Sequence, residues 1–333
     1  MANTYKGTDG VDNVKQQNDG THDYFNIYTY GGDDTIKLTL GATYVDAGDD
    51  NDTVKSSIEN NNDIKLGDGD DSYTGNGFSN SINHYDRVWG GNGNDTFTVD
   101  TDVSDYYGGA GNDFYNSAGY SNYFDGGSGR DTVSYQRQDT DNFLSGRGVK
   151  VNLMDHYAIT GGGREEALYN VEDLIGTSAD DTLGGTNGKN NIQGMDGFDV
   201  LHGREGDDKL YGGHGGDNLF GDEGNDKLYG QRGTDLLDGG DGADTFVFQS
   251  VKDSVVGDNR DVIDDFSHSQ GDKIDVSAIG DFTFIGNHHF SGTPDELRFA
   301  GHIVQGDVNG DGKADFEIKV ANVDSLQASD FIL

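Results

Sequence analysis

The residues best placed to do chemistry are aspartates that recur with glycine every nine residues from Gly176 onward. The eight units begin at Gly176, Gly185, Gly194, Gly203, Gly212, Gly221, Gly230 and Gly239. Carboxylates are the hard oxygen ligands that calcium prefers, and glycine admits the left-handed backbone of a tight turn. The eighth position of every unit is apolar and fills a narrow interior. The sixth positions predict calcium ligands at Asp181, Asp199, Asp208, Asp217, Asp226, Asp235 and Asp244, with Asn190 in the same phase.

These units resemble the RTX repeat, GGxGxDxUx, most closely over residues 212–220 and 239–247. The resemblance implies that two nonapeptides form one coil of a parallel β-roll, so turns 18 residues apart stack at roughly 4.8 Å and hold calcium. Asp199, Asp217 and Asp235 would line one edge of the roll. A glycine-rich linker is the alternative, but a linker does not keep an apolar residue in phase.

Composition alone is typical of a disordered chain, with 32% hydrophobic residues, 54 glycines and a net charge of −39. About ten calcium ions would cancel roughly half of that charge and supply the missing cohesion. The absence of cysteine suits an extracellular protein stabilised by metal. The acidity excludes nucleic acid as a partner, and we expect neither a membrane span nor an N-terminal secretory signal.

A looser rhythm precedes the regular run. Acidic turns end at Asp34, Asp52, Asp71, Asp95, Asp113 and Asp131, mostly 18 residues apart. This spacing predicts coils with one calcium turn each, with ligands at Asp52, Asp71, Asp95, Asp113 and Asp131, and ordinary polar loops at the opposite turn. Two positions after the six aspartates, and seven before them, every residue is apolar or aromatic. These twelve residues should point inward and stack as ladders.

The neighbouring positions should point outward. One outward row reads Tyr28, Asp46, Lys65, Trp89, Tyr107, Asp125, and the other reads Asn26, Tyr44, Asp63, Arg87, Asp105, Tyr123. Sugars bind such faces through ring stacking and charged hydrogen bonds, so the rows predict a polysaccharide-binding surface that includes Trp89, Tyr123, Tyr44 and Asp63. The alternative is that tyrosine merely suits strands and solvated sheet faces.

Catalysis on this face would follow one of two routes. In a lyase, Arg87 and Lys65 would neutralise a uronate carboxylate while Tyr107, Tyr85 or His84 exchanges the proton beside it. The last two lie in or beside an insertion at residues 77–86. A glycosidase would instead use two carboxylates, Asp63 with Asp105 or Asp105 with Asp125.

The end of the chain carries a second resemblance. DVIDDF at 261–266, GDKIDVSAI at 271–279, ELRF at 296–299 and the terminal ASDFIL are similar to the C-terminal domain of serralysin-type secreted proteins. That likeness implies an uncleaved signal for type I secretion machinery, matched by residues 330–333. Protease activity is not implied, because the chain has no HExxH.

A further calcium loop is expected within this domain. Asp307, Asn309, Asp311 and Asp315 form a loop similar to an EF-hand, but its twelfth position is Ile318 in place of glutamate. A polar hairpin turn is the alternative.

The sequence therefore predicts an all-β protein: a parallel β-roll or β-helix solenoid with 18-residue coils, and a C-terminal serralysin-like β domain. Its expected parts are an irregular solenoid at 1–147, a connecting cap at 148–175 whose His156 and Glu165 are surface residues, the nonapeptide roll at 176–248, and the domain at 249–333. We expect a secreted calcium-binding protein. Its N-terminal solenoid would bind an acidic extracellular polysaccharide and, as an enzyme, would also cleave it. A non-catalytic matrix, adhesion or host-interaction role is the alternative.

Overall fold

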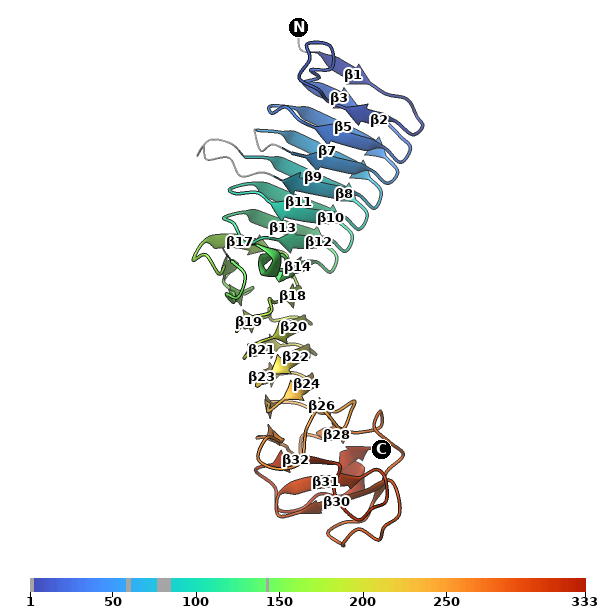
Figure 1. Cartoon of the computed structure of the whole chain (residues 1–333), viewed down its shortest axis with the longest axis vertical. Coiled ribbons are helices and arrows are strands. Elements are labelled where there is room, and N and C mark those ends of the chain that lie inside the picture. The colour runs from blue at the N-terminus through green and yellow to red at the C-terminus, as the bar shows by residue number, and fades with distance from the viewer. Residues whose placement is uncertain (1–2, 58–60, 77–84, 142–143) are drawn as a thin grey trace. The chain divides into compact units, whose positions relative to one another are not determined.

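The computed structural model describes residues 3–57, 61–76, 85–141 and 144–333. The chain divides into two compact units, residues 1–175 and 176–333. Strands and turns build nearly all of both units (Figure 1), with two short 3₁₀ helices, η1 (Gln136–Thr140) and η2 (Ala328–Asp330). In the described part of the chain, no helix is long and apolar enough to cross a membrane.

Unit 1 winds its strands alternately into two parallel ladders. One ladder contains β1 (Thr4–Lys6), β3 (Asn26–Tyr28), β5 (Tyr44–Asp49), β7 (Asp63–Asp68), β9 (Arg87–Asn92), β11 (Asp105–Ala110), β13 (Tyr123–Ser128) and β17 (Glu165–Tyr169). The other contains β2 (Asn13–Lys15), β4 (Thr35–Leu38), β6 (Thr53–Ser56), β8 (Ser72–Asn76), β10 (Thr96–Asp100), β12 (Phe114–Ser117), β14 (Thr132–Ser134) and β18 (Asp173–Ile175). The short strands β15 (Lys150–Asn152) and β16 (Tyr157–Ile159) form an antiparallel hairpin, and β16 pairs with β17.

The core of unit 1 consists of the inward ladders that the sequence predicts. Val45 pairs with Ile64, and Phe97 pairs with Tyr115, each one coil further along the chain. All twelve predicted inward residues are fully buried: Ile27, Ile36, Val45, Val54, Ile64, Tyr73, Val88, Phe97, Tyr106, Tyr115, Phe124 and Val133. The predicted alternation of inward and outward positions is therefore confirmed.

Unit 2 begins with a narrower roll. Its first ladder contains β19 (Thr182–Gly184), β21 (Val200–Glu205), β23 (Asn218–Glu223), β25 (Leu236–Asp238) and β27 (Asp261–Ile263). Its second contains β20 (Asn191–Asp196), β22 (Lys209–Gly215), β24 (Lys227–Gly233), β26 (Thr245–Val247) and β28 (Lys273–Asp275). Leu201 pairs with Leu219 in parallel, one 18-residue coil apart, which confirms the predicted parallel β-roll.

The C-terminal segment extends both ladders of this roll. Its strands are β29 (Thr283–Phe284), β30 (Glu296–Ala300), β31 (Ile303–Asp307), β32 (Phe316–Val320) and β33 (Phe331–Ile332). Strands β30 to β32 form an antiparallel meander, β32 pairs in parallel with β27, and β33 pairs in parallel with β28. Of the expected secretion residues, Asp330 lies in η2 and Phe331 and Ile332 form β33, with Phe331 buried and the terminal Leu333 exposed.

Candidate functional site

Aspartates form a continuous hydrogen-bonded ladder along both edges of the unit 2 roll. The backbone N–H of Asp199 donates to Oδ1 of Asp217 at 2.9 Å, and Asp217 repeats this bond to Asp235. The opposite edge is built in the same way, from Asn190 through Asp208, Asp226 and Asp244 to Asp272 at 2.7–3.0 Å. One carboxylate oxygen per turn therefore fixes the register of successive coils.

The second carboxylate oxygen of most edge aspartates is buried without a hydrogen-bond donor. These Oδ2 atoms belong to Asp34, Asp52, Asp71, Asp95, Asp113 and Asp131 in unit 1 and to Asp199, Asp217, Asp226, Asp235, Asp244 and Asp261 in unit 2. A buried carboxylate oxygen without a partner costs several kilocalories per mole, so this geometry requires either a proton or a cation.

Where a turn begins with glycine, the missing Cβ leaves space beside that oxygen. The turns of Asp34, Asp52 and Asp71 begin instead with Thr29, Ala47 and Leu66. A Cβ atom on Gly212 would lie 2.4 Å from Asp217 Oδ2 and 2.8 Å from the carbonyl oxygen of Gly230 in the next coil. Gly203 and Gly221 have the same surroundings, with Asp208 and Asp226 respectively. Two acceptor oxygens thus converge on one small space, and calcium fits this donor set because it accepts both carboxylate and backbone carbonyl ligands.

Side chains alone do not complete these sites. Within the described ranges, no three acidic or histidine side chains gather closely enough to hold a metal between them. A calcium ion in these turns would therefore take one or two carboxylates and fill its remaining coordination positions with backbone carbonyls or water.

Burial shifts the titration of these carboxylates strongly upward. Desolvation raises the pKa of Asp95, Asp199 and Asp226 to about 8, and the hydrogen bond from the preceding coil offsets only part of the shift. Burial likewise raises the pKa of Asp71 and Asp217 to about 6. Without a cation, Asp95, Asp199 and Asp226 therefore favour the protonated form near neutral pH, whereas Asp71 and Asp217 reach it only in mild acid.

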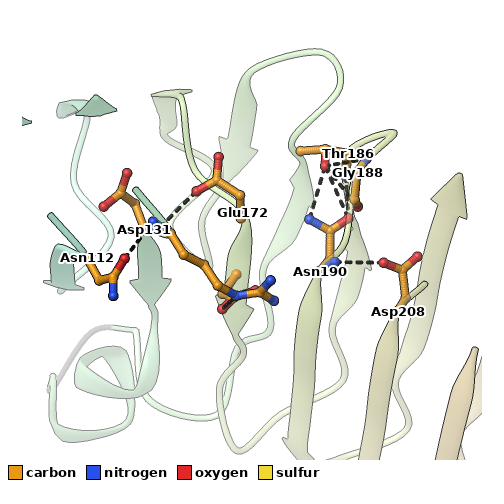
Figure 2. Close-up of polar contacts among 9 residues, drawn as sticks. Asn112, Asp131, Glu172, Thr186, Gly188, Asn190 and Asp208 are labelled. Carbon is orange, nitrogen blue, oxygen red and sulfur yellow. Dashed lines mark hydrogen bonds and ion pairs between the residues drawn. The ribbon is translucent and has the colours of Figure 1, made fainter. Parts of the chain in front are cut away.

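Unit 1 has a comparable aspartate edge, which includes Asp34 although this residue is not among the predicted ligands. Its Oδ1 accepts the Asp12 N–H, and the ladder continues to Asp131. Glu172 supplies the last acceptor, because its Oε2 takes the Asp131 N–H at 2.8 Å (Figure 2).

The opposite edge of unit 1 is a polar ladder that needs no metal. The N–H of Asn62 donates to Asp86, that of Asp86 donates to the Ser104 hydroxyl oxygen, and that of Ser104 donates to Asn122. The sequence predicts ordinary polar loops here, whereas the structure buries these side chains and links them between coils. Their mixed residue types left no periodic signal to detect.

The predicted outward rows lie side by side on the ladder of β5, β7, β9, β11 and β13. Lys65 pairs with Trp89, and Trp89 pairs with Tyr107. The Trp89 and Tyr107 rings stack with centroids 5.7 Å apart, and Tyr123 lies 5.6 Å beyond Tyr107. The row continues through two residues that the sequence did not select, Tyr169 at 5.3 Å from Tyr123 and His156 at 4.7 Å from Tyr169. We call Trp89, Tyr107, Tyr123, Tyr169 and His156 the aromatic face.

Charged residues flank one end of the aromatic face. Arg87 lies 5.8 Å from the ring centroids of both Tyr85 and Trp89, and it forms a 2.7 Å ion pair with Asp63. Lys65 lies 5.9 Å from the centroid of Tyr44. His84 falls outside the described residues.

Two of the predicted catalytic residues, Asp105 and Tyr107, have a raised pKa. Burial raises the pKa of Asp105, although Arg87 opposes this shift. Burial also raises the pKa of Tyr107, with contributions from Asp105 and Asp125. Tyr107 therefore stays protonated at neutral pH, where it can donate a hydrogen bond but is a poor base.

The structure also forms two cavities that the sequence patterns did not reveal. One of about 340 Å³ adjoins the aromatic face, and its lining includes Asp105, Tyr123, His156 and Glu165. The other, of about 690 Å³, lies in unit 2 over β20, β22 and β24, with Tyr211 and Arg232 in its lining. Both depend on loops folding back onto a sheet, which period counting does not capture.

The loop at residues 307–315 forms the turn of the antiparallel β31–β32 hairpin. Asp307 is fully buried, and its carboxylate accepts the N–H groups of Gly310 and Gly312 at 2.8 Å each. Asp315 accepts the Val308 N–H and the Asn309 side-chain amide. Calcium binding by this loop stays a prediction.

Comparisons with known proteins bear on the repeats. A model of the RTX calcium-binding nonapeptide repeat matches residues 85–102, 107–139, 184–219 and 211–246, which lie in both units. Among solved structures, the AlgE6R3 subunit from the Azotobacter vinelandii mannuronan C5-epimerase is 30% identical, with a TM-score of 0.31. That alignment covers 46% of this chain and 78% of the other. No curated protein matches.

Proposed function

We propose that this RTX-repeat protein, which binds several calcium ions, uses the aromatic face of unit 1 to bind an extracellular polysaccharide. The observation that carries the proposal is the unbroken row of rings from Trp89 to His156, with neighbouring centroids 4.7–5.7 Å apart. Calcium supports this role by closing the coils on which the rings lie.

The row suits a chain-like ligand because it crosses successive coils. Aromatic rings offer apolar faces to sugar rings, while tyrosine hydroxyl groups donate hydrogen bonds at their edges. Four of the five rings come from strands that hydrogen bonds hold in register, so little side-chain freedom is lost on binding.

The flanking cations favour a polysaccharide that carries carboxylates. Arg87 presents a planar guanidinium beside Trp89, and Lys65 is exposed on the adjacent strand. Asp63 already pairs with Arg87, so a ligand carboxylate would share or displace that contact.

The same geometry supports binding more strongly than cleavage. A lyase needs a group that accepts a proton, whereas the raised pKa of Tyr107 keeps its hydroxyl protonated at neutral pH. The non-catalytic matrix or adhesion role is therefore our first choice, and cleavage is a separate outcome of the test.

We also propose secretion before folding, through the C-terminal residues. In the folded unit, Phe331 and Ile332 pair with β28, so an export machinery would have to read them from the unfolded chain. Scarce cytosolic calcium would keep the roll unfolded until export. A chain that lacks residues 328–333 should remain in cells that express a type I exporter, and its undiminished export would contradict this role.

Binding is tested with calcium-loaded protein on immobilised polygalacturonate, with dextran as the neutral comparison. Removing one stacking ring should weaken binding by about 1–2 kcal/mol, or roughly tenfold, so Trp89→Ala and Tyr107→Ala should each reduce affinity. Tyr211→Ala, which removes a similar half-buried, stacked ring beside the larger cavity, is the matched control. Circular dichroism would show that each variant still folds with calcium.

The outcomes separate the parts of the proposal. Unchanged affinity in both face variants would reject the aromatic face, and a loss confined to Tyr211→Ala would move the site to unit 2. Equal binding to dextran would reject the preference for carboxylates. Release of unsaturated uronates or reducing ends would show that the protein is an enzyme.

A further inference from the structure

Three turns differ from the calcium turns in having threonine at their second position. They are GTDGVD at residues 7–12, GTSADD at 176–181 and GTNGKN at 185–190. The first is the first turn on the aspartate edge of unit 1, and the other two are the first turns on the two edges of unit 2. Each thus begins a ladder.

In these turns the threonine supplies the donors that the calcium turns lack. The Thr177 N–H donates to Asp181 Oδ2 at 2.6 Å, and its hydroxyl donates to Asp181 Oδ1 at 3.1 Å. At the other edge, the Thr186 N–H donates to Asn190 Oδ1 at 2.8 Å, and the Asn190 amide donates to the Thr186 hydroxyl oxygen at 3.1 Å (Figure 2). The Thr8 N–H donates to Asp12 Oδ2 at 2.7 Å.

Backbone conformation explains why the donors face the carboxylate in these turns and not in the nonapeptide turns that follow them. The second residue of later turns is left-handed, with φ of 90° at Met195, 82° at Arg204 and 117° at Gly213. Thr8, Thr177 and Thr186, all among the described residues, do not have positive φ. A β-branched residue avoids that region, so threonine selects a turn in which its own N–H points at the acid.

The space beside the acid is otherwise unchanged. A Cβ on Gly176 would lie 2.2 Å from Asp181 Oδ2 and 2.7 Å from the Gly194 carbonyl oxygen, much as at Gly212. The same oxygens therefore converge in a threonine turn, but N–H and hydroxyl donors satisfy the acid. A cation is not required there, and at Asn190 the negative charge that would attract one is absent.

We propose that the threonine turns are calcium-free starter turns that close the first coil of each edge with protein hydrogen bonds. In unit 2 the calcium sites then begin at Asp199 and Asp208. This inference rests on calcium binding by the repeats and adds which turns take the ion. It removes Asp181 from the ligands that the sequence predicts.

The test counts bound calcium in the full chain by isothermal titration and by metal analysis after dialysis. Asp181→Asn should leave the number of ions unchanged, because Thr177 can hold an amide as Thr186 does. Asp199→Asn, the same substitution one coil further along that edge, should reduce the number. Equal losses in both variants would overturn the proposal.

A gain-of-site variant tests the same idea in the other direction. Thr186→Gly combined with Asn190→Asp converts GTNGKN to the calcium-turn pattern GGNGKD, and this chain should bind one additional ion. Asn190→Asp alone keeps Thr186, with its hydroxyl donor and a β-branched side chain that avoids positive φ, so it should bind no additional ion. An unchanged count in the glycine variant, in a chain that binds its other ions and folds, would reject the inference. A wild-type chain that binds no calcium would reject calcium binding itself.

Discussion

At the scale of the residue, the two oxygens of an edge aspartate have different tasks. In Asp217, Oδ1 accepts the Asp199 N–H and sets the register of the coils, while Oδ2 is buried without a donor beside Gly212. Asparagine can perform the first task but not the second, as Asn122 illustrates on the other edge of unit 1, where its Oδ1 accepts the Ser104 N–H from the preceding coil. Metal binding and coil register are therefore separable by a single substitution.

Asp217→Asn should bind less calcium while retaining the roll at high calcium. Losing a charged ligand in a buried site costs on the order of 1–3 kcal/mol, so the calcium midpoint of folding should rise about tenfold. Calcium titration followed by circular dichroism measures the shift. Asp281→Asn makes the same charge change at an exposed position and should leave the midpoint in place; an equal shift in both would mean that net charge, and not the site, controls folding.

Spacing was enough to predict which aspartates line the edges, because the turn recurs with one glycine and one acid in fixed phase. It does not distinguish Asp181 from Asp199, because the two aspartates occupy the same position in the repeat. The difference lies in Thr177, and in the donors that its backbone conformation directs at the carboxylate. Local hydrogen bonding of this kind is not a periodic property.

At the scale of the element, unit 1 has an aspartate ladder along one edge of its coils and a polar ladder along the other. The ladder of Asn62, Asp86, Ser104 and Asn122 ends at Glu166 of β17, whose side chain is fully enclosed. Its Oε1 accepts the Ser117 hydroxyl at 2.9 Å. Burial raises the pKa of Glu166 to about 8, and hydrogen bonds from Ser117 and Asn122 only partly oppose the shift.

This shift predicts a pH-dependent loss of stability. The folded state binds the Glu166 proton more tightly than the unfolded chain does, so the stabilisation is complete below about pH 4.5 and is lost as the pH rises through about 8. In saturating calcium, the unfolding free energy of Glu166→Gln relative to wild type should therefore rise by on the order of 3 kcal/mol when the pH is raised from 5 to 9. Urea unfolding at both pH values measures this, with the exposed Glu165→Gln as control. Parallel pH profiles for all three chains would contradict it.

The coils themselves could be predicted because inward and outward residues alternate with period two, and the twelve inward positions follow directly from the aspartate spacing. The polar ladder could not, since Asn62, Asp86, Ser104 and Asn122 share hydrogen-bonding capacity but not identity. The extension of the aromatic face to Tyr169 depends on β17 pairing with β13, although the paired residues are 44 positions apart. A long connection between coils leaves no spacing from which to predict such a neighbour.

At the scale of the whole molecule, folding depends on neutralising acidic groups that the coils bring together. The chain carries a net charge of −39 and only 32% hydrophobic residues, so its apolar interior cannot offset the repulsion alone. Calcium and protons are alternative ways to neutralise the buried edges, because desolvation raises the pKa of Asp95, Asp199 and Asp226 to about 8.

In chelator at pH 7.5, the chain should therefore expand toward the unfolded radius of gyration of about 65 Å expected for its length. Calcium should contract it, whereas magnesium should not, because magnesium demands a small octahedral site and sheds water reluctantly. Lowering the pH to 5.5 without metal should cause partial contraction, since edge groups with raised folded-state pKa stabilise the fold as they take up protons. At that pH more calcium should be needed for full folding, because protons compete for the same oxygens. Small-angle scattering and circular dichroism over a grid of pH and calcium concentrations would measure both effects. A radius of gyration that does not change with calcium at pH 7.5 would refute metal-dependent closure.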